Sequence, residues 1–305
     1  MMEGGPPSPA SRGTDALTEP LADSAPVAWA EAPRRCYRDP QTGQTCLWYH
    51  RVWQYLRLFG IISSIRTNTD FLTRCFRDCA RARPHPVVLV SAAADYSMLA
   101  HLKHACDLER SPLDATIVDR CETSLFLNRW YADRFNLVLA TACCNVIEYA
   151  TERRFDLICT HNFLGRFDDD SRRLLVARWH TLLRPGGVVV TTQRIRPNAR
   201  AARSFYTDEQ ARELSERVAA VARAHPQRLD LDVDQLARAV YEYAIRRAAH
   251  TIRTNREILD IFEAVGFDVA VADDGEGEAE RQRDRPSAPD AGTDTYRMRI
   301  VARKR

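Results

Sequence analysis

The stretch FDLICTHNFLGRF, residues 155–167, opens with an apolar run typical of a strand that is buried on both faces. Asp168–Ser171 follow, and their short side-chain oxygens suit the N-terminus of a helix. That helix has an apolar stripe at Leu175, Trp179 and Leu182. It ends at the Pro-Gly-Gly turn of LLRPGGVVVTT, residues 182–192, where a second apolar strand begins. This order predicts a right-handed strand–helix–strand unit.

The same alternation continues on both sides of this unit. Further strands are expected at residues 86–90, 115–119, 135–140, 267–271 and 295–302, and helices at 97–108 and 122–134. Strands that alternate with helices in this way form parallel sheets. The sequence therefore predicts an α/β fold with a doubly wound, mostly parallel seven-stranded sheet and helices on both faces.

Three regions lie outside this alternation. Residues 1–33 are rich in Pro, Ala, Ser and Gly, which predicts a disordered tail. Residues 34–84 form an N-terminal helical extension, which either packs on the domain or caps a substrate pocket. Residues 85–305 form the main domain, with a helical insertion at about 200–254 after strand five and a flexible loop at about 273–294.

Composition limits the classes of function. A net charge of +3 over 305 residues gives no strong electrostatic attraction to nucleic acid or to a membrane surface. No apolar run approaches the ~20 residues that a membrane-spanning helix needs. The nine cysteines include no C-x-x-C pair, so we expect reduced thiols in a cytoplasmic protein and no metal site.

FDLI, LLRPGGVVVTT and the turn EAVGF at residues 263–267 together resemble the class I S-adenosylmethionine (SAM)-dependent methyltransferases. The resemblance covers about residues 86–302. It implies that the last strand is antiparallel, and that SAM is held at the carboxyl ends of strands one to four. This is the edge at which open α/β sheets bind their ligands.

Two positions carry the expected cofactor contacts. Asp119 ends the second strand, where a carboxylate can accept both ribose hydroxyls; capping of the next helix is the alternative role. The family's glycine-rich loop is replaced here by Ser91–Ser97, which contains no glycine. Alanine, serine and aspartate can keep a similar path, and Asp95 could attract the ammonium group of SAM.

The resemblance places adenine contacts after the third strand, near Thr141–Asn145. The complete set of cofactor-binding residues implied in this way is Ser91, Ala92, Ala93, Asp95, Tyr96, Asp119, Arg120, Thr141, Ala142, Cys143, Thr160 and Phe163.

The reacting end is expected at the end of the fourth strand. His161 is the candidate base, with a structural, hydrogen-bonded histidine as the alternative, and Asn162 could orient the substrate. Two further groups could meet the acceptor, the aromatic residues of the insertion and the arginines after strand five: Phe205, Tyr206, Tyr241, Tyr243, Arg194, Arg196 and Arg203.

The sequence favours SAM-dependent methyl transfer to a small-molecule substrate. The alternatives are a catalytically inactive, methyltransferase-like binding or regulatory protein, and an RNA methyltransferase that uses the basic helices at residues 51–83. A membrane partner is not expected, nucleic acid is disfavoured by the near-neutral charge, and the oligomeric state is left open.

Overall fold

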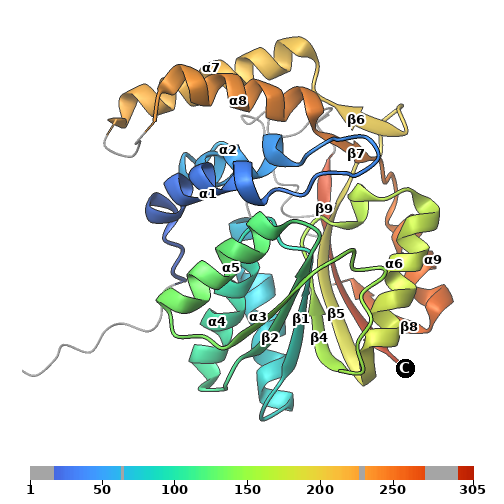
Figure 1. The fold of residues 1–305 in the computed structure, drawn as a ribbon. Helices are drawn as coiled ribbons and strands as arrows, with labels where there is room; N and C mark the ends of the chain where they lie inside the picture. The colour runs from blue at the N-terminus through green and yellow to red at the C-terminus, as the bar shows by residue number, and fades with distance from the viewer. Residues whose placement is uncertain (1–16, 63–64, 227–230, 272–294) are drawn as a thin grey trace, which may run out of the picture.

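A computed structural model describes residues 17–62, 65–226, 231–271 and 295–305. Its central sheet has the strand order β3-β2-β1-β4-β5-β9-β8 (Figure 1). The strands are β1 (Val87–Ser91), β2 (Asp114–Asp119), β3 (Leu139–Cys143), β4 (Phe155–Cys159), β5 (Leu183–Ile195), β8 (Phe267–Val271) and β9 (Tyr296–Lys304). β1 to β5 pair in parallel, and β9 lies antiparallel between β5 and β8. The predicted fold class is confirmed, including the antiparallel closing strand.

Helices cover both faces because the strand side chains alternate between two apolar clusters. Val88 and Val90 face α3 (Thr69–Ala82), α4 (Ser97–Glu109) and α5 (Glu122–Arg134). Leu89 faces the other side, where α6 (Asp169–Leu182) and α9 (Asn255–Val265) pack. The stripe predicted for α6 is fully buried on that side, at Leu175, Trp179 and Leu182.

The predicted helix ends follow from local hydrogen bonds. Asp168 caps α6 by accepting from the backbone N–H of Ser171 at 2.9 Å. Thr254 and Glu257 form a reciprocal capping box at the start of α9. Gly266 ends α9 with a φ of 101°, a conformation that glycine adopts without steric cost.

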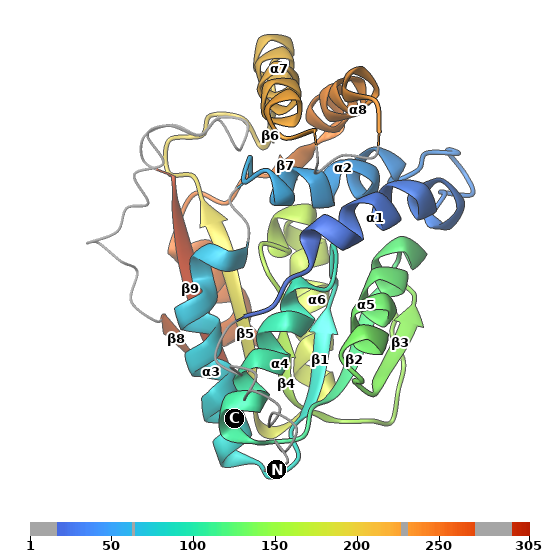
Figure 2. The ribbon, with the colours of Figure 1, turned by 90° about the vertical axis from the view of Figure 1, so that its left-hand side faces the viewer.

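Four helices form a layer over the carboxyl ends of the parallel strands (Figures 1 and 2). They are α1 (Leu21–Arg35), α2 (Leu47–Leu58), α7 (Asp208–Ala224) and α8 (Val233–Arg246). α2 packs on α8, and the four share one apolar cluster that includes Tyr55, Leu214 and Tyr243. We call this layer the cap. The N-terminal extension and the insertion, far apart in sequence, thus build one structure. The connections around it include η1 (Ile65–Asn68), η2 (Leu164–Arg166) and a two-stranded ribbon of β6 (Arg203–Phe205) with β7 (Ala248–His250).

Three sequence expectations need correction. The disordered tail predicted for residues 1–33 is wrong from Leu21 onward, where α1 begins. Its buried stripe is Ala25, Ala28 and Ala32, so neither its small side chains nor its two internal prolines suggested a helix. The third strand occupies residues 139–143 rather than 135–140, because Asn136 turns the chain with a φ of 52° after α5. The insertion expected to be helical over about 200–254 is not helical throughout, since α8 ends at Arg246 and β7 follows.

Residues 1–16 and the loop predicted at 273–294 lie outside the described residues. None of the helices in the described part of the chain has the length and apolar character needed to cross a membrane.

Candidate active site

A cavity of about 330 Å³ lies between the carboxyl ends of the strands and the cap, a volume in the range of small-molecule sites. Its floor comes from the loop after β1, the end of β2, the end of β4 and the end of β5. Its roof comes from α2, with Trp48, Tyr49, Trp53 and Arg57 among the lining residues. The cap therefore covers the edge at which this type of sheet binds ligands, and the cavity lies between the two.

The loop after β1 keeps a tight path without glycine. Ala92 has a φ of 64°, the left-handed conformation that glycine would adopt without strain. The N–H of Ala93 donates to Oδ2 of Asp119 at 3.0 Å, and the N–H of Cys121 donates to Oδ1 at 2.7 Å. Asp119 thus ties two loops together and also lines the cavity. Burial raises its pKa to about 6, although His50 and these two amides act in the opposite direction.

Asp95 lines the cavity as predicted, but its carboxylate is heavily engaged. Oδ2 accepts from Arg57 at 2.6 Å, from Gln54 at 3.0 Å and from Trp53 at 3.1 Å, all on α2. Oδ1 accepts from the N–H of Ser97 at 2.8 Å. Arg57 also pairs with Glu19, and none of these three ionic side chains is more than 1% exposed. Asp95 therefore anchors the cap to the loop after β1, and its charge is already neutralised.

The end of β4 presents four consecutive residues to the cavity, Thr160 to Phe163. Asn162 has a φ of 51°, a conformation that asparagine tolerates better than most residues. Oγ1 of Thr160 and Oδ1 of Asn162 are buried without a hydrogen-bond partner among the described residues. A buried polar atom without a partner costs free energy, so both atoms are suited to a ligand.

His161 is held by a residue of η1. Nδ2 of Asn68 lies 3.4 Å from Nε2 of His161, while Oδ1 of Asn68 accepts from Nε of Arg299 at 3.2 Å. Because the amide nitrogen is a donor, Nε2 of His161 acts as an acceptor in this arrangement. Burial, with Arg297 and Arg194 nearby, holds the pKa of His161 well below its usual range, so the ring is neutral at pH 7.

The far side of the cavity is rich in guanidinium groups. Its lining includes Arg166, Arg194, Arg196 and Arg247, from η2, β5 and the segments that follow β5 and α8. Arg166, Arg194 and Arg247 pair with no carboxylate in the described part of the chain. Burial and the charges of Arg297, Arg196 and Arg247 lower the pKa of Arg194 to about 9. Arginine nevertheless keeps its proton at pH 7, so this side of the cavity favours an anion.

Eight of the predicted site residues line the cavity: Ala92, Ala93, Asp95, Asp119, Thr160, His161, Asn162 and Phe163. The structure does not bring the other six to it. Ser91 accepts from Nε1 of Trp179 at 2.8 Å in the core, and Tyr96 stacks on Tyr131 with ring centroids 4.7 Å apart. Tyr96 therefore leaves the cavity open.

The remaining four lie beyond the wall of the cavity. Arg120 stacks over the ring of Tyr37 at 4.2 Å, because the segment before α2 covers the end of β2. Thr141, Ala142 and Cys143 lie within β3, whose end is three residues later than predicted, instead of in the loop after it. The aromatic residues of the insertion also stay outside: Tyr206 and Tyr243 are buried in the cap, and Phe205 and Tyr241 are at the surface.

Sequence reasoning missed the cavity residues of α2, such as Tyr49, His50 and Arg57. The signal is present in the sequence, because apolar residues recur at helical spacing from Leu47 to Ile62, within the helical extension predicted at residues 34–84, with arginine on the other face. Nothing in that pattern showed that one arginine would enter the site. Arg166 and Arg247 were also missed, because their place depends on how the insertion folds back.

No protein-family model and no curated protein sequence matches the chain. Among solved structures, a SAM-dependent methyltransferase from Clostridium acetobutylicum ATCC 824 has a TM-score of 0.50 at 10% identity, over 82% of this chain and 96% of that one. NodS, an N-methyltransferase from Bradyrhizobium japonicum WM9 in complex with S-adenosyl-L-homocysteine, has a TM-score of 0.46 at 12% identity, over 94% of this chain and 99% of that one. SibL, a SAM-dependent methyltransferase in its apo form, has a TM-score of 0.45 at 14% identity, over 95% of this chain and 71% of that one.

The similarity to the Clostridium structure and the strand order give the chain a class I methyltransferase fold. At this level of identity they establish the fold alone.

Proposed function

We propose that this protein is a SAM-dependent methyltransferase that acts on an anionic small molecule. One observation supports this best: a single cavity joins the cofactor edge of a methyltransferase sheet, at Asp119 and the loop after β1, to an arginine-rich side at Arg194 and Arg247. The first part suits a nucleoside cofactor, and the second suits the acceptor.

The residues present fit SAM. Asp119 lines the cavity with lone pairs available beyond its two amide contacts, and the left-handed Ala92 keeps the tight loop. When bound, SAM supplies a methyl group on a positively charged sulfur. Asp119 would hold the ribose hydroxyls, and Thr160 and Asn162 would offer their unsatisfied oxygens to the ligands.

The chain's own residues then orient the acceptor and exclude water. Arg194 and Arg247 would hold the negative charge of the acceptor, with the roof of Trp48, Tyr49 and Trp53 keeping solvent out. His161 is neutral and borders the cavity. It can receive a proton from the acceptor atom once its Nε2 is released from Asn68, because a neutral imidazole has a single acceptor nitrogen.

The decisive experiment is calorimetric titration of the purified protein with SAM. Micromolar binding, with transfer of labelled methyl to members of an anionic metabolite panel, supports the proposal. Binding of SAM without transfer to any acceptor contradicts the enzymatic part. An absence of heat with folded protein contradicts both parts and favours the inactive binding protein.

A non-catalytic binding protein is the second candidate, favoured by the engagement of Asp95 with Arg57. The RNA methyltransferase has less support. Arginines of the helices at residues 51–83 are already engaged in ion pairs, since Arg57 pairs with Asp95, while Arg77 and Arg81 pair with Glu109.

A further inference from the structure

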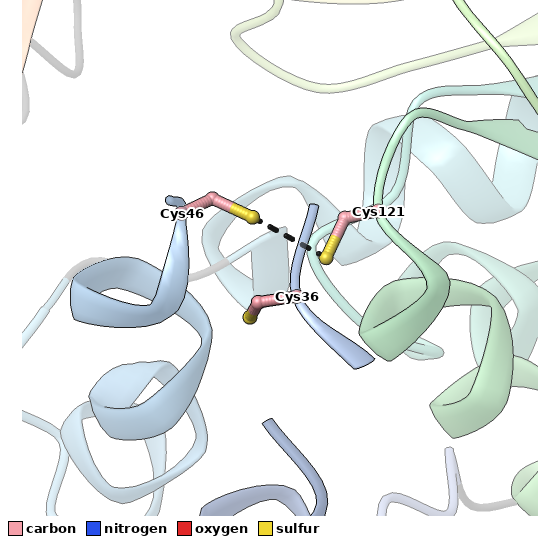
Figure 3. Close-up of side chains that lie close together, drawn as sticks. All are labelled: Cys36, Cys46 and Cys121. Atoms are coloured by element: carbon pink, nitrogen blue, oxygen red, sulfur yellow. Dashed lines mark hydrogen bonds between the residues drawn. The ribbon is translucent and has the colours of Figure 1, made fainter. Parts of the chain in front are cut away.

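Three cysteine side chains from separate segments meet beside the cavity (Figure 3). Cys36 follows α1, Cys46 precedes α2, and Cys121 precedes α5. All three Sγ atoms lie within 4.8 Å of one another, and those of Cys46 and Cys121 are 3.4 Å apart. Two thiolates bound to one zinc ion with ~2.3 Å bonds at tetrahedral angles lie about 3.8 Å apart. The observed spacing is close to that value.

Local structure holds two of these thiols together. Residues 37–46 form a hairpin in which Arg38 bridges Thr45, and the N–H of Cys46 donates to the carbonyl of Tyr37 at 3.3 Å. Asp39 stabilises the turn by accepting from the N–H groups of Gln41 and Thr42. The hairpin therefore brings Cys36 and Cys46 close across ten residues of sequence.

The third thiol is set by the edge of the sheet. Oδ1 of Asp119 accepts from the N–H of Cys121 at 2.7 Å, which fixes the turn between β2 and α5. Cys121 is 3% exposed, so its sulfur is shielded from solvent.

A fourth possible donor lies close to this group of three thiols but outside it. His50 is on the first turn of α2, four residues after Cys46, which puts both on one face of the helix. Its side chain is 7% exposed, and Nδ1 has no hydrogen-bond partner among the described residues. A small movement of the imidazole toward the three thiols would complete a set of four donors.

The composition of the cluster also agrees with a metal site. An odd number of thiols cannot be satisfied by disulfides, and a disulfide would leave His50 without a role. Three cysteines with one histidine are a usual ligand set of structural zinc.

We propose that Cys36, Cys46, His50 and Cys121 bind one zinc ion. Four protein ligands leave no open coordination position, so the ion is structural. It pins the segment between α1 and α2 onto the start of α5, next to Asp119. Because Cys46 and His50 also border the cavity, the zinc would hold the wall of the site in place. This inference does not depend on methyl transfer.

The test is zinc analysis of untagged protein purified without chelators. We expect about one zinc per chain, lost in Cys46→Ser and Cys121→Ser and retained in Cys75→Ser, a control cysteine of similar burial on α3. Zinc-free wild type prepared with a chelator should melt at a lower temperature and recover when Zn²⁺ is added back.

A cobalt titration covers variants that fold poorly. Zinc-free wild type with Co²⁺ should show the thiolate charge-transfer band and the intense visible bands of a tetrahedral site, and His50→Ala should weaken them. Three results would overturn the proposal: wild type that binds neither zinc nor Co²⁺ with its thiols reduced, a Cys46–Cys121 disulfide in freshly purified protein, or equal loss of zinc in Cys75→Ser.

Discussion

Nη1 of Arg57 lies 2.6 Å from Oδ2 of Asp95, and this buried ion pair joins the cap to the loop after β1. Glu19 completes it from the segment before α1. The sheet edge and the cap are therefore connected by charge as well as by apolar packing. The loop after β1 contributes to the floor of the cavity and α2 forms its roof. The ion pair therefore fixes the position of α2 relative to that loop.

Arg57→Met should be strongly destabilising, because it leaves Asp95 buried without a cation and leaves Glu19 with Arg66 alone. We expect a loss of about 3–5 kcal/mol in the free energy of unfolding, measured with urea. Arg212→Met, which removes an exposed ion pair with Asp208, should cost less than about 1 kcal/mol. Equal effects would show that the buried pair contributes no more than a surface one.

Asp119→Ala should weaken SAM binding by about 1–3 kcal/mol, since it removes charge-assisted hydrogen bonds to the ribose. Calorimetry gives the change directly. Asp114→Ala, at the opposite end of the same strand, is the matched control and should leave the affinity unchanged. Unchanged affinity in Asp119→Ala would remove this carboxylate from the cofactor site.

His161→Ala should slow turnover far more than it weakens SAM binding, because the ring lies at the reacting end of β4. Steady-state kinetics and calorimetry separate the two effects. His104→Ala on α4 serves as the control. Full activity in His161→Ala would make the residue structural, as its contact with Asn68 also allows.

The depressed pKa of His161 gives a signed dependence of stability on pH. Below pH 6.5 His161 binds a proton in the unfolded chain but not in the folded protein. The free energy of unfolding therefore falls as the pH drops toward the folded-state pKa. As the pH falls, the free energy of unfolding of wild type should therefore decrease by up to about 1.4 kcal/mol per pH unit more than that of His161→Gln. Urea unfolding at pH 7.5 and 5.5 measures this, and parallel losses in both proteins would refute it.

Arg194→Gln should reduce the binding of anions at the far side of the cavity. Inorganic phosphate serves as the probe: it should raise the melting temperature of wild type and have a smaller effect on the variant. Arg200→Gln, an exposed arginine five residues beyond β5, should respond like wild type. An equal response of all three proteins would contradict an anionic acceptor site.

The sheet was predictable because its signals are local. Val88–Val90 and Leu157–Cys159 are apolar without interruption, which is typical of parallel strands covered on both faces. Asp168, Thr207 and Thr254 cap helices through contacts within three residues, and these too were visible. α1 was missed because its buried face is alanine, whose burial depends on partners elsewhere in the chain.

The site was only partly predictable. Asp119 and Thr160–Phe163 follow from their places at strand ends, so the sequence located them. Asp95 was also located. It was expected to attract the ammonium group of SAM, but it binds Arg57, which lies 38 residues away in the sequence. Sequence spacing also gave no sign of the three thiols, because Cys121 is 75 residues from Cys46.

The sequence by itself determined the order of strands and helices, and with it the edge where a ligand would lie, because hydrophobic periodicity and capping act over a few residues. Only the tertiary structure decided what meets at that edge. Arg57 on Asp95, Asn68 on His161 and Cys46 beside Cys121 arise from segments that pack together after the chain has folded. Such contacts depend on three-dimensional placement, which local patterns of residues do not encode.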